Sequence, residues 1–365
     1  MKHIPLLKVN LPSKSKLFNA VSKVIDSGII AEGEFVYDFE NKFATNFGYN
    51  NVLALNSGTS ALHLALKLSG VKPGDEVIST SMTAEPTNTS ILQAGGIPIF
   101  ADICYETGNI DPESIKKVIT EKTRAIVVVH YAGYPAEIKK IKKIAADNNI
   151  KIIEDCAHAL GAMIGNKPVG SFGDFGIFSF QAIKHLTTID GGILISKRSR
   201  DYSRAKKLRW FGLSKSISRE SNRITEAGFK YNFNNFNAAI GLEQLKMINS
   251  KISKYISNGE YLHLMLEKRS SKIKPATILS DVTPTFWFFT GFCKDSKRII
   301  SKLNQAGIQA AKVHLPNHLH PIFKSSVRIK LEQTNQFYHD LIHLPTGHWV
   351  NNRDRAKMLN EILKL

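Results

Sequence analysis

The sequence predicts an α/β fold with a mainly parallel central sheet flanked by helices, and two patterns support this prediction. Short, nearly continuous apolar runs recur from about residue 50 onward, at intervals that suit β-α units. The stretches between them are helical in pattern, so each strand would be covered on both faces, as in a parallel sheet. The chain has 365 residues, more than one core usually holds, so we expect one large domain and one smaller domain.

The strands are expected in a regular order along the first part of the chain. They cover residues 52–55, 76–78, 97–101, 124–130 and 150–154, and further apolar runs follow at 176–180 and 193–195. Helical stretches separate them, beginning with SGTSALHLALKLSG directly after the first strand. This alternation is typical of an α/β architecture.

The pattern changes after residue 245. A long lysine-rich helix is expected at 247–269, then an aromatic strand at 285–293, a helix at 296–306 and a stretch rich in histidine and proline at 314–321. We therefore predict a large α/β domain at 1–247 and a small α+β domain at 248–365.

The composition indicates an ordinary soluble globular protein, with 43% hydrophobic and 22% charged residues. No uninterrupted apolar run is long enough for a transmembrane helix, and the N-terminus lacks the apolar region of a signal peptide. The three cysteines are scattered and not at metal-ligand spacing, which favours reduced thiols over a disulfide framework or a structural zinc site. We expect a cytoplasmic protein that is not membrane-bound and holds no metal.

The charge is strongly positive, with 49 Lys+Arg against 31 Asp+Glu and a net charge of +18. Such a charge can steer a nucleic acid, a membrane surface or a small phosphorylated substrate toward the protein. No long block of like charge and no basic, aromatic-interleaved strand pair is present, so nucleic-acid binding is not expected. The alternative is a compositional bias of lysines on solvated helix faces.

Three local features carry possible chemistry, and each also has a simpler explanation. After the first strand, LNSGTSAL opens a helix whose free backbone N–H groups can bind phosphate, although Ser and Thr are also ordinary N-caps. Asp155 follows an apolar strand where a buried carboxylate needs a cationic partner, unless it caps an exposed helix. Lys184 lies between two apolar runs, where a desolvated amine can form a Schiff base, unless it extends to water.

Together, the three features match what pyridoxal 5'-phosphate requires. A phosphate cradle, an aspartate for the protonated pyridine nitrogen and a lysine for the Schiff base follow one another at the ends of successive strands. The sequence therefore predicts a site for this cofactor.

The chain resembles the sugar aminotransferases of the DegT/DnrJ/EryC1/StrS family, within the fold-type I pyridoxal-phosphate enzymes. The resemblance rests on the stretches LNSGTSALHLAL, IIEDCAHALGA, GSFGDFGIFSFQAIKHLTTIDGG and GFKYNFNNFNAAIGLEQL, with a weaker match at KVHLPNHLHPIFK. It implies that Lys184 forms the Schiff base and moves the proton during transamination, with pyridoxamine 5'-phosphate as the intermediate form of the cofactor. Asp155 would hold the ring nitrogen protonated and His158 would orient the ring near its 3-oxygen. The phosphate would be bound by Gly58, Thr59, Ser60 and Ser179.

The resemblance also implies a homodimer with composite sites. The segment GFKYNFNNFNAAIG corresponds to a loop and helix that reach into the partner's site, and Lys230 stands where an asparagine is common. That lysine could pair with the cofactor phosphate of the other subunit. A second departure is the absence of the aromatic residue that commonly stacks on the ring, since Met82 and Ala84 occupy the corresponding stretch. Either Met82 or an unidentified side chain would cover that face.

The substrates implied by the resemblance are a nucleotide-diphosphate keto-deoxysugar and an amino-acid donor, with glutamate preferred. A 4-keto-6-deoxyhexose is our first expectation and a 3-keto sugar the alternative, and the product would feed glycan or lipopolysaccharide (O-antigen) synthesis. Candidate substrate contacts are Arg209, Trp210, Arg219, His314 and His320. For Trp210 a place in the core is an equal alternative, and for each histidine a structural role.

Two other functions remain as alternatives. Some relatives carry histidine in place of the lysine and act as nucleotide-sugar 3-dehydratases, but this chain keeps Lys184 and places His185 after it. A basic binding protein without catalysis would explain the charge but not the combination of Lys184 and Asp155.

Overall fold

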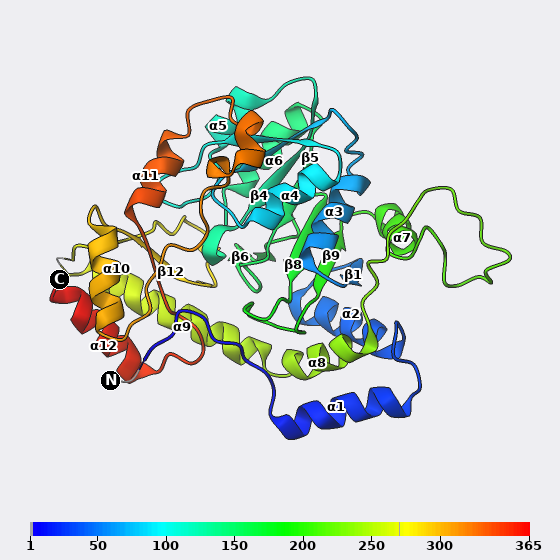
Figure 1. Cartoon of the computed structure of the whole chain (residues 1–365), viewed down its shortest axis with the longest axis horizontal. Coiled ribbons are helices and arrows are strands. Elements are labelled where there is room, and N and C mark those ends of the chain that lie inside the picture. The colour runs from blue at the N-terminus through cyan, green and yellow to red at the C-terminus, as the bar shows by residue number, and fades with distance from the viewer. Residues whose placement is uncertain (1–2, 270) are drawn as a thin grey trace.

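The computed structural model describes residues 3–269 and 271–365, and its largest element is a seven-stranded sheet (Figure 1). The strands are β1 (Val52–Leu55), β2 (Glu76–Thr80), β3 (Ile97–Ala101), β4 (Thr123–Val129), β5 (Lys151–Asp155), β8 (Phe175–Ser179) and β9 (Gly192–Ser196). Their order is β1-β9-β8-β5-β4-β2-β3. Only β9 runs antiparallel to its neighbours. The predicted mainly parallel sheet is confirmed.

Helices cover both faces of this sheet. They are α2 (Glu34–Phe47), α3 (Gly58–Leu68), α4 (Glu85–Gln93), α5 (Pro112–Val118), α6 (Ile138–Asp147), α7 (Ser199–Leu208) and α8 (Asn235–Leu245), while α1 (Lys14–Asp26) packs on the outside of α8. Alternate strand residues point to opposite faces: Ala54 packs in one cluster with α2, α5, α6 and α8, and Leu55 packs in another with α3 and α7. Because both faces are buried, the strands are nearly continuous apolar runs, as the sequence pattern indicated.

The C-terminal part forms a smaller layered unit. It contains α9 (Ile248–Glu267), α10 (Ser296–Gln305), α11 (Glu332–Asp340), α12 (Asn352–Leu363) and a sheet of β10 (Lys274–Pro275), β12 (Phe289–Phe292) and β13 (Leu341–Leu344). The expected helices at 247–269 and 296–306 are present. Ile4 also packs in this core and bridges to Ile308, so the segment around Ile4 lies against the C-terminal part.

One expected strand is much shorter than predicted. Residues 285–288 of the aromatic run 285–293 leave the strand, and only β12 (Phe289–Phe292) remains. Phe286 has a φ of +45°, outside the range of a strand, and the N–H of Thr285 donates to Gly133 O at 3.0 Å. The first aromatic residues of this run therefore form a bend that packs on η1 (Tyr131–Gly133), and the strand begins only after them.

The remaining short elements connect these units. A small sheet joins β6 (Met163–Ile164), β7 (Lys167–Pro168) and β11 (Val282–Thr283), and two 3-10 helices, η2 (Asn317–Leu319) and η3 (Pro321–Ser326), lie in the histidine-rich stretch. Within the ranges that the structure describes, no helix combines the length and apolar character that crossing a membrane would need.

Candidate active site

One cavity lies where the predicted features meet. It has a volume of about 400 Å³, a size suited to a small-molecule ligand or cofactor. Its walls come from the carboxyl ends of β5 and β8, the first turns of α3 and α4, and the loop between β8 and β9. Open α/β sheets bind ligands at this end of their strands. Six predicted cofactor-site residues line it: Gly58, Thr59, Asp155, His158, Ser179 and Lys184.

The first turn of α3 forms one wall of the cavity. Ser57 caps this helix by accepting a 3.0 Å hydrogen bond from the Ser60 N–H, whereas the N–H groups of Gly58 and Thr59 have no acceptor among the described residues. These N–H groups and the positive end of the helix dipole favour an anion. A Cβ on Gly58 would lie 2.8 Å from Cβ of Ser179, so only glycine lets β8 pack against this turn.

Asp155 is the last residue of β5 and is 5% exposed. Its carboxylate accepts a 2.8 Å hydrogen bond from the Thr87 hydroxyl and a 3.1 Å bond from the Ala157 N–H. Burial raises its pKa, while these two donors and the nearby charge of Lys184 act in the opposite direction. A cationic group beside Asp155 would stabilise the ionised carboxylate further.

Lys184 lies on the loop that joins β8 to β9. The loop is closed by hydrogen bonds from the Thr188 N–H to Phe180 O at 3.0 Å and from the Phe180 N–H to Gly191 O at 2.8 Å. Burial lowers the pKa of Lys184 to about 8, against the opposing effect of Asp155. More of this amine is therefore neutral near pH 7 than for an ordinary lysine, as a nucleophile requires.

His158 lies at the cavity wall with its ring buried. Burial, reinforced by the charge of Lys184, holds its pKa well below the usual range, so the imidazole is neutral. Its Nδ1 is buried and has no hydrogen-bond partner among the described residues. A buried polar atom without a partner is costly, so this nitrogen is available to a bound group.

Two predicted cofactor residues lie elsewhere. The Ser60 hydroxyl donates to Asn56 Oδ1 at 2.6 Å and does not line the cavity, so Ser57 takes the place expected for it. Lys230 is exposed, and its backbone O accepts a 3.3 Å hydrogen bond from Asn56 beside the cradle. Its side chain does not line the cavity of its own chain.

Arg209 is not brought to the cavity. Its guanidinium is 3% exposed and forms ion pairs with Glu32 at 2.6 Å and Glu40 at 2.8 Å, and it also donates to Ala54 O at 2.9 Å. Since these acceptors take both terminal nitrogens, Arg209 joins α7 to α2 and β1. The expected substrate contact is thus replaced by a structural ion pair.

The other candidate substrate residues divide into two groups. Trp210 lines a second cavity with Tyr37, and Arg219 lies exposed in the loop after it, so neither reaches the first cavity of its own chain. His314 and His320 lie nearer. The His314 ring is 5.4 Å from that of His158, and His320 Nε2 is 3.7 Å from Oε1 of Glu85, which lines the cavity.

Sequence reasoning missed several side chains that shape the site. The only sequence feature that could have indicated Ser57 and Thr87 is a hydroxyl at the start of a helix. Trp287 was expected within the aromatic strand and not beside the site. Ala84 and Pro86 of the stretch expected to stack on the ring line the cavity, whereas Met82 is fully buried in the cluster that contains Tyr131. Met82 therefore does not cover a ring in this cavity.

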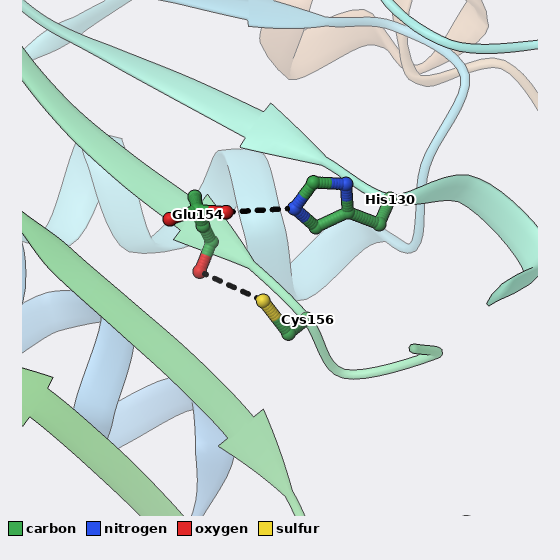
Figure 2. Close-up of side chains that lie close together, drawn as sticks. All are labelled: His130, Glu154 and Cys156. Carbon is green, nitrogen blue, oxygen red and sulfur yellow. Dashed lines mark hydrogen bonds and ion pairs between the residues drawn. The ribbon is translucent and has the colours of Figure 1, made fainter. Parts of the chain in front are cut away.

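A buried cluster of His130, Glu154 and Cys156 lies at the ends of β4 and β5 (Figure 2). Its residue types suit a metal ion, but its atoms are already engaged. The Glu154 carboxylate accepts from the N–H groups of Gly170, Phe172 and Gly173 at 2.7–2.8 Å and from His130 Nε2 at 3.1 Å. His130 Nδ1 accepts from the Ala136 N–H at 3.0 Å. This donor set fits a hydrogen-bonded support for the end of β5 and does not fit a metal centre.

The cavity residues fit pyridoxal phosphate. The free N–H groups of α3 suit its phosphate. Among the described residues, Asp155 forms no ion pair and Nδ1 of His158 has no hydrogen-bond partner. Fold and site together define a pyridoxal-phosphate-dependent enzyme of the α/β class. The DegT/DnrJ/EryC1/StrS aminotransferase family matches residues 13–363, so the chain belongs to this family and is a pyridoxal-phosphate-dependent aminotransferase.

Individual relatives agree with this assignment. The GDP-perosamine synthase of Escherichia coli O157:H7 is 32% identical over 327 residues, covering 88% of each chain. The crystal structure of AtS13 from Actinomadura melliaura superposes with a TM-score of 0.95 at 31% identity, over 100% of this chain and 99% of that one. The sugar aminotransferase CalS13 from Micromonospora echinospora gives 0.94 at 29% identity, with 99% of both chains covered.

Proposed function

We propose that the protein transfers an amino group from glutamate to the keto group of a nucleotide-diphosphate deoxysugar, with a 4-keto-6-deoxyhexose as the first candidate. The observation that carries the proposal is the convergence of Lys184, Asp155 and the start of α3 on one cavity. Two relatives named GDP-perosamine synthase, from Escherichia coli and Caulobacter vibrioides, support the substrate class. The net charge of +18 favours capture of a substrate that carries phosphates.

Each cavity residue then has a defined task. Pyridoxal phosphate supplies, when bound, an aldehyde that exchanges amino groups and a ring that accepts electrons. The N–H groups of Gly58 and Thr59 and the hydroxyls of Ser57 and Ser179 would bind its phosphate. Asp155 would pair with its ring nitrogen.

Lys184 would transfer the proton and His158 would orient the bound group. The Lys184 amine, with a pKa of about 8, is neutral often enough to attack and to take up a proton, and as an ammonium it returns that proton. His158, held neutral by burial, would donate or accept a single hydrogen bond and so fix the orientation of the bound group.

We also propose a homodimer with composite sites. Phe18 and Ile25 on α1 are 62% and 60% exposed, and Ile189, next to the cavity residue Asp190, is 54% exposed. Helix α1 lies at the edge of the molecule, and the loop that follows α7 extends away from the body (Figure 1). A second copy would cover these apolar side chains and bring Arg219 or Lys230 to the partner's cavity. The three free cysteines agree with a cytoplasmic location.

The experiment is an absorbance spectrum of the purified protein with pyridoxal phosphate, before and after L-glutamate. We expect a violet band that moves to the near-ultraviolet as the cofactor takes its amine form, pyridoxamine phosphate. Incubation with a nucleotide-linked 4-keto-6-deoxyhexose should restore the band and give an amino sugar by mass spectrometry. A deoxygenated product would indicate the dehydratase instead.

The matched variants are Lys184→Ala and Lys251→Ala. Lys251 likewise has a pKa lowered by burial to about 8, but its amine donates to Gln244 and does not line the cavity. Only Lys184→Ala should lose the violet band. If both variants keep it, Lys184 is not the reactive lysine.

A further inference from the structure

Trp287 contacts both reactive side chains of the cavity from the C-terminal part of the chain. The Lys184 Nζ lies over its ring, 4.1 Å from the centroid. The His158 ring stacks on it at 3.9 Å and 20° between planes. The indole Nε1–H donates to Ile183 O at 3.2 Å, one residue before the lysine. One side chain thus contacts the amine, the imidazole and the loop that carries the amine.

The backbone before Trp287 is held in an unfavourable conformation. Phe286 has a φ of +45°, which a bulky L residue rarely adopts. Its carbonyl accepts a 2.6 Å hydrogen bond from the Thr346 hydroxyl. Its ring occupies the space beside Gly259, where any Cβ would lie 2.1 Å from it. Such strain persists only where surrounding contacts enforce it, and it accumulates at functional sites.

The position of Trp287 also explains how the amine is kept inside the site. Trp287 is 2% exposed and does not line the cavity, so it acts through its neighbours. The carboxylate that raises the pKa of Lys184 is that of Asp155, which a bound cationic ring would engage. An aromatic face attracts an ammonium without forming a bond that must be broken before the amine reacts.

We propose that Trp287 is a positioning residue that holds the Lys184 amine and the His158 ring in their reactive places. This inference rests on the proposed function only in taking Lys184 as the reactive lysine. Since the indole face stabilises the ammonium and not the neutral amine, loss of the ring should favour the neutral form. The pKa of Lys184 should then fall below that of the wild-type protein.

The test follows the amine itself in the protein freed of cofactor. Trinitrobenzenesulfonate labels neutral lysine amines, and mass spectrometry of the peptide that contains Lys184 gives its labelling rate at each pH. In Trp287→Leu the apparent pKa of Lys184 should fall by about one unit, the size of a desolvated cation–π contact. In Trp287→Phe, which keeps a weaker ring but loses the bond to Ile183 O, the fall should be smaller and in the same direction.

Trp349→Phe is the matched control. Its indole N–H also donates to a backbone carbonyl, Pro5 O at 2.9 Å, but its ring contacts are with Tyr255 and His348. This variant should leave the labelling profile of Lys184 unchanged. An unchanged profile in a folded Trp287→Leu protein would overturn the proposal. If that variant does not fold, the absence of a downward shift in Trp287→Phe overturns it.

The two proposals fail in different ways. A wild-type protein that forms no violet band with pyridoxal phosphate contradicts the proposed function, while the labelling experiment still measures the contact of Trp287 with Lys184. A normal band with no shift in the Trp287 variants contradicts only the positioning role.

Discussion

The hydroxyl of Thr87, on α4, donates a 2.8 Å hydrogen bond to Oδ2 of Asp155, at the end of β5. The two residues are 68 positions apart in the chain and meet because β2 and β5 lie on either side of β4. This bond favours the ionised carboxylate, which burial disfavours. It therefore supports the charge that Asp155 would need to bind a protonated pyridine nitrogen.

Replacing Thr87 by valine should weaken the binding of pyridoxal phosphate by about tenfold, since a hydrogen bond to a charged group contributes roughly 1.5 kcal/mol or more. Absorbance titration of the cofactor-free protein measures the affinity. Thr89→Val is the control, because that hydroxyl, on the same helix, donates to Glu85 O at 3.2 Å and does not line the cavity. Equal losses in both variants would contradict the role of Thr87.

Cofactor capture by the cofactor-free protein should depend on the Lys184 amine. Because its pKa is lowered to about 8, the neutral fraction rises with pH and levels off above that value. The rate of formation of the violet band should fall about tenfold per pH unit below this pKa. Stopped-flow absorbance between pH 6 and about 9 gives the profile, which for an unperturbed lysine would still be rising steeply at the upper end. Lys251→Met should leave it unchanged.

Arg209 should matter for stability and not for substrate binding. Arg209→Ala leaves the buried carboxylate of Glu40 without its cation and removes one of the two cations of Glu32, which keeps Lys215 at 2.8 Å, so the free energy of unfolding should fall by about 3–5 kcal/mol. Arg204→Ala breaks an exposed pair with Glu226 and should cost under about 1 kcal/mol. Chemical denaturation measures both. A stable Arg209→Ala protein with only a raised KM would restore Arg209 as a substrate contact.

Glu154 should support the end of β5 without a metal. Glu154→Gln turns one acceptor into a donor facing backbone N–H groups, so the free energy of unfolding should fall by about 1–3 kcal/mol for each N–H left unpaired. Treatment with a chelator should change neither the thermal midpoint nor the violet band. A midpoint that falls with chelator and recovers with a divalent cation would show that the cluster of Figure 2 binds metal.

If the active sites are shared between subunits, dissociation of the proposed dimer at low protein concentration should weaken cofactor binding. Phe18→Asp combined with Ile25→Asp places charges on the exposed apolar side of α1 and should shift the protein toward monomers in sedimentation velocity. If cavities are shared, cofactor affinity should fall with the dimer. Monomeric wild-type protein that binds the cofactor fully would contradict composite sites.

The sequence predicted the fold well because its signals are local. The run 97–101 coincides with β3, since both faces of a parallel strand are buried and its residues are almost all apolar. The bend at Phe286 was missed because a local sequence pattern does not show contacts with distant segments. Its run of consecutive aromatic residues resembles a buried strand, while the carbonyl of Gly133 and the hydroxyl of Thr346 that hold it lie far away in the sequence.

The sequence by itself determined the central sheet, the start of α3 after the first strand, and the places of Asp155 and Lys184 near strand ends. These features depend on where the strands lie and end, and short apolar runs in the sequence predict the strands and their ends. Only the tertiary structure decided that the Thr87 hydroxyl donates to Asp155. It also decided that Arg209 forms its ion pairs with Glu32 and Glu40, and that the ring of Trp287 contacts the Lys184 amine. These roles depend on which distant segments become neighbours, and a single local pattern does not contain that information.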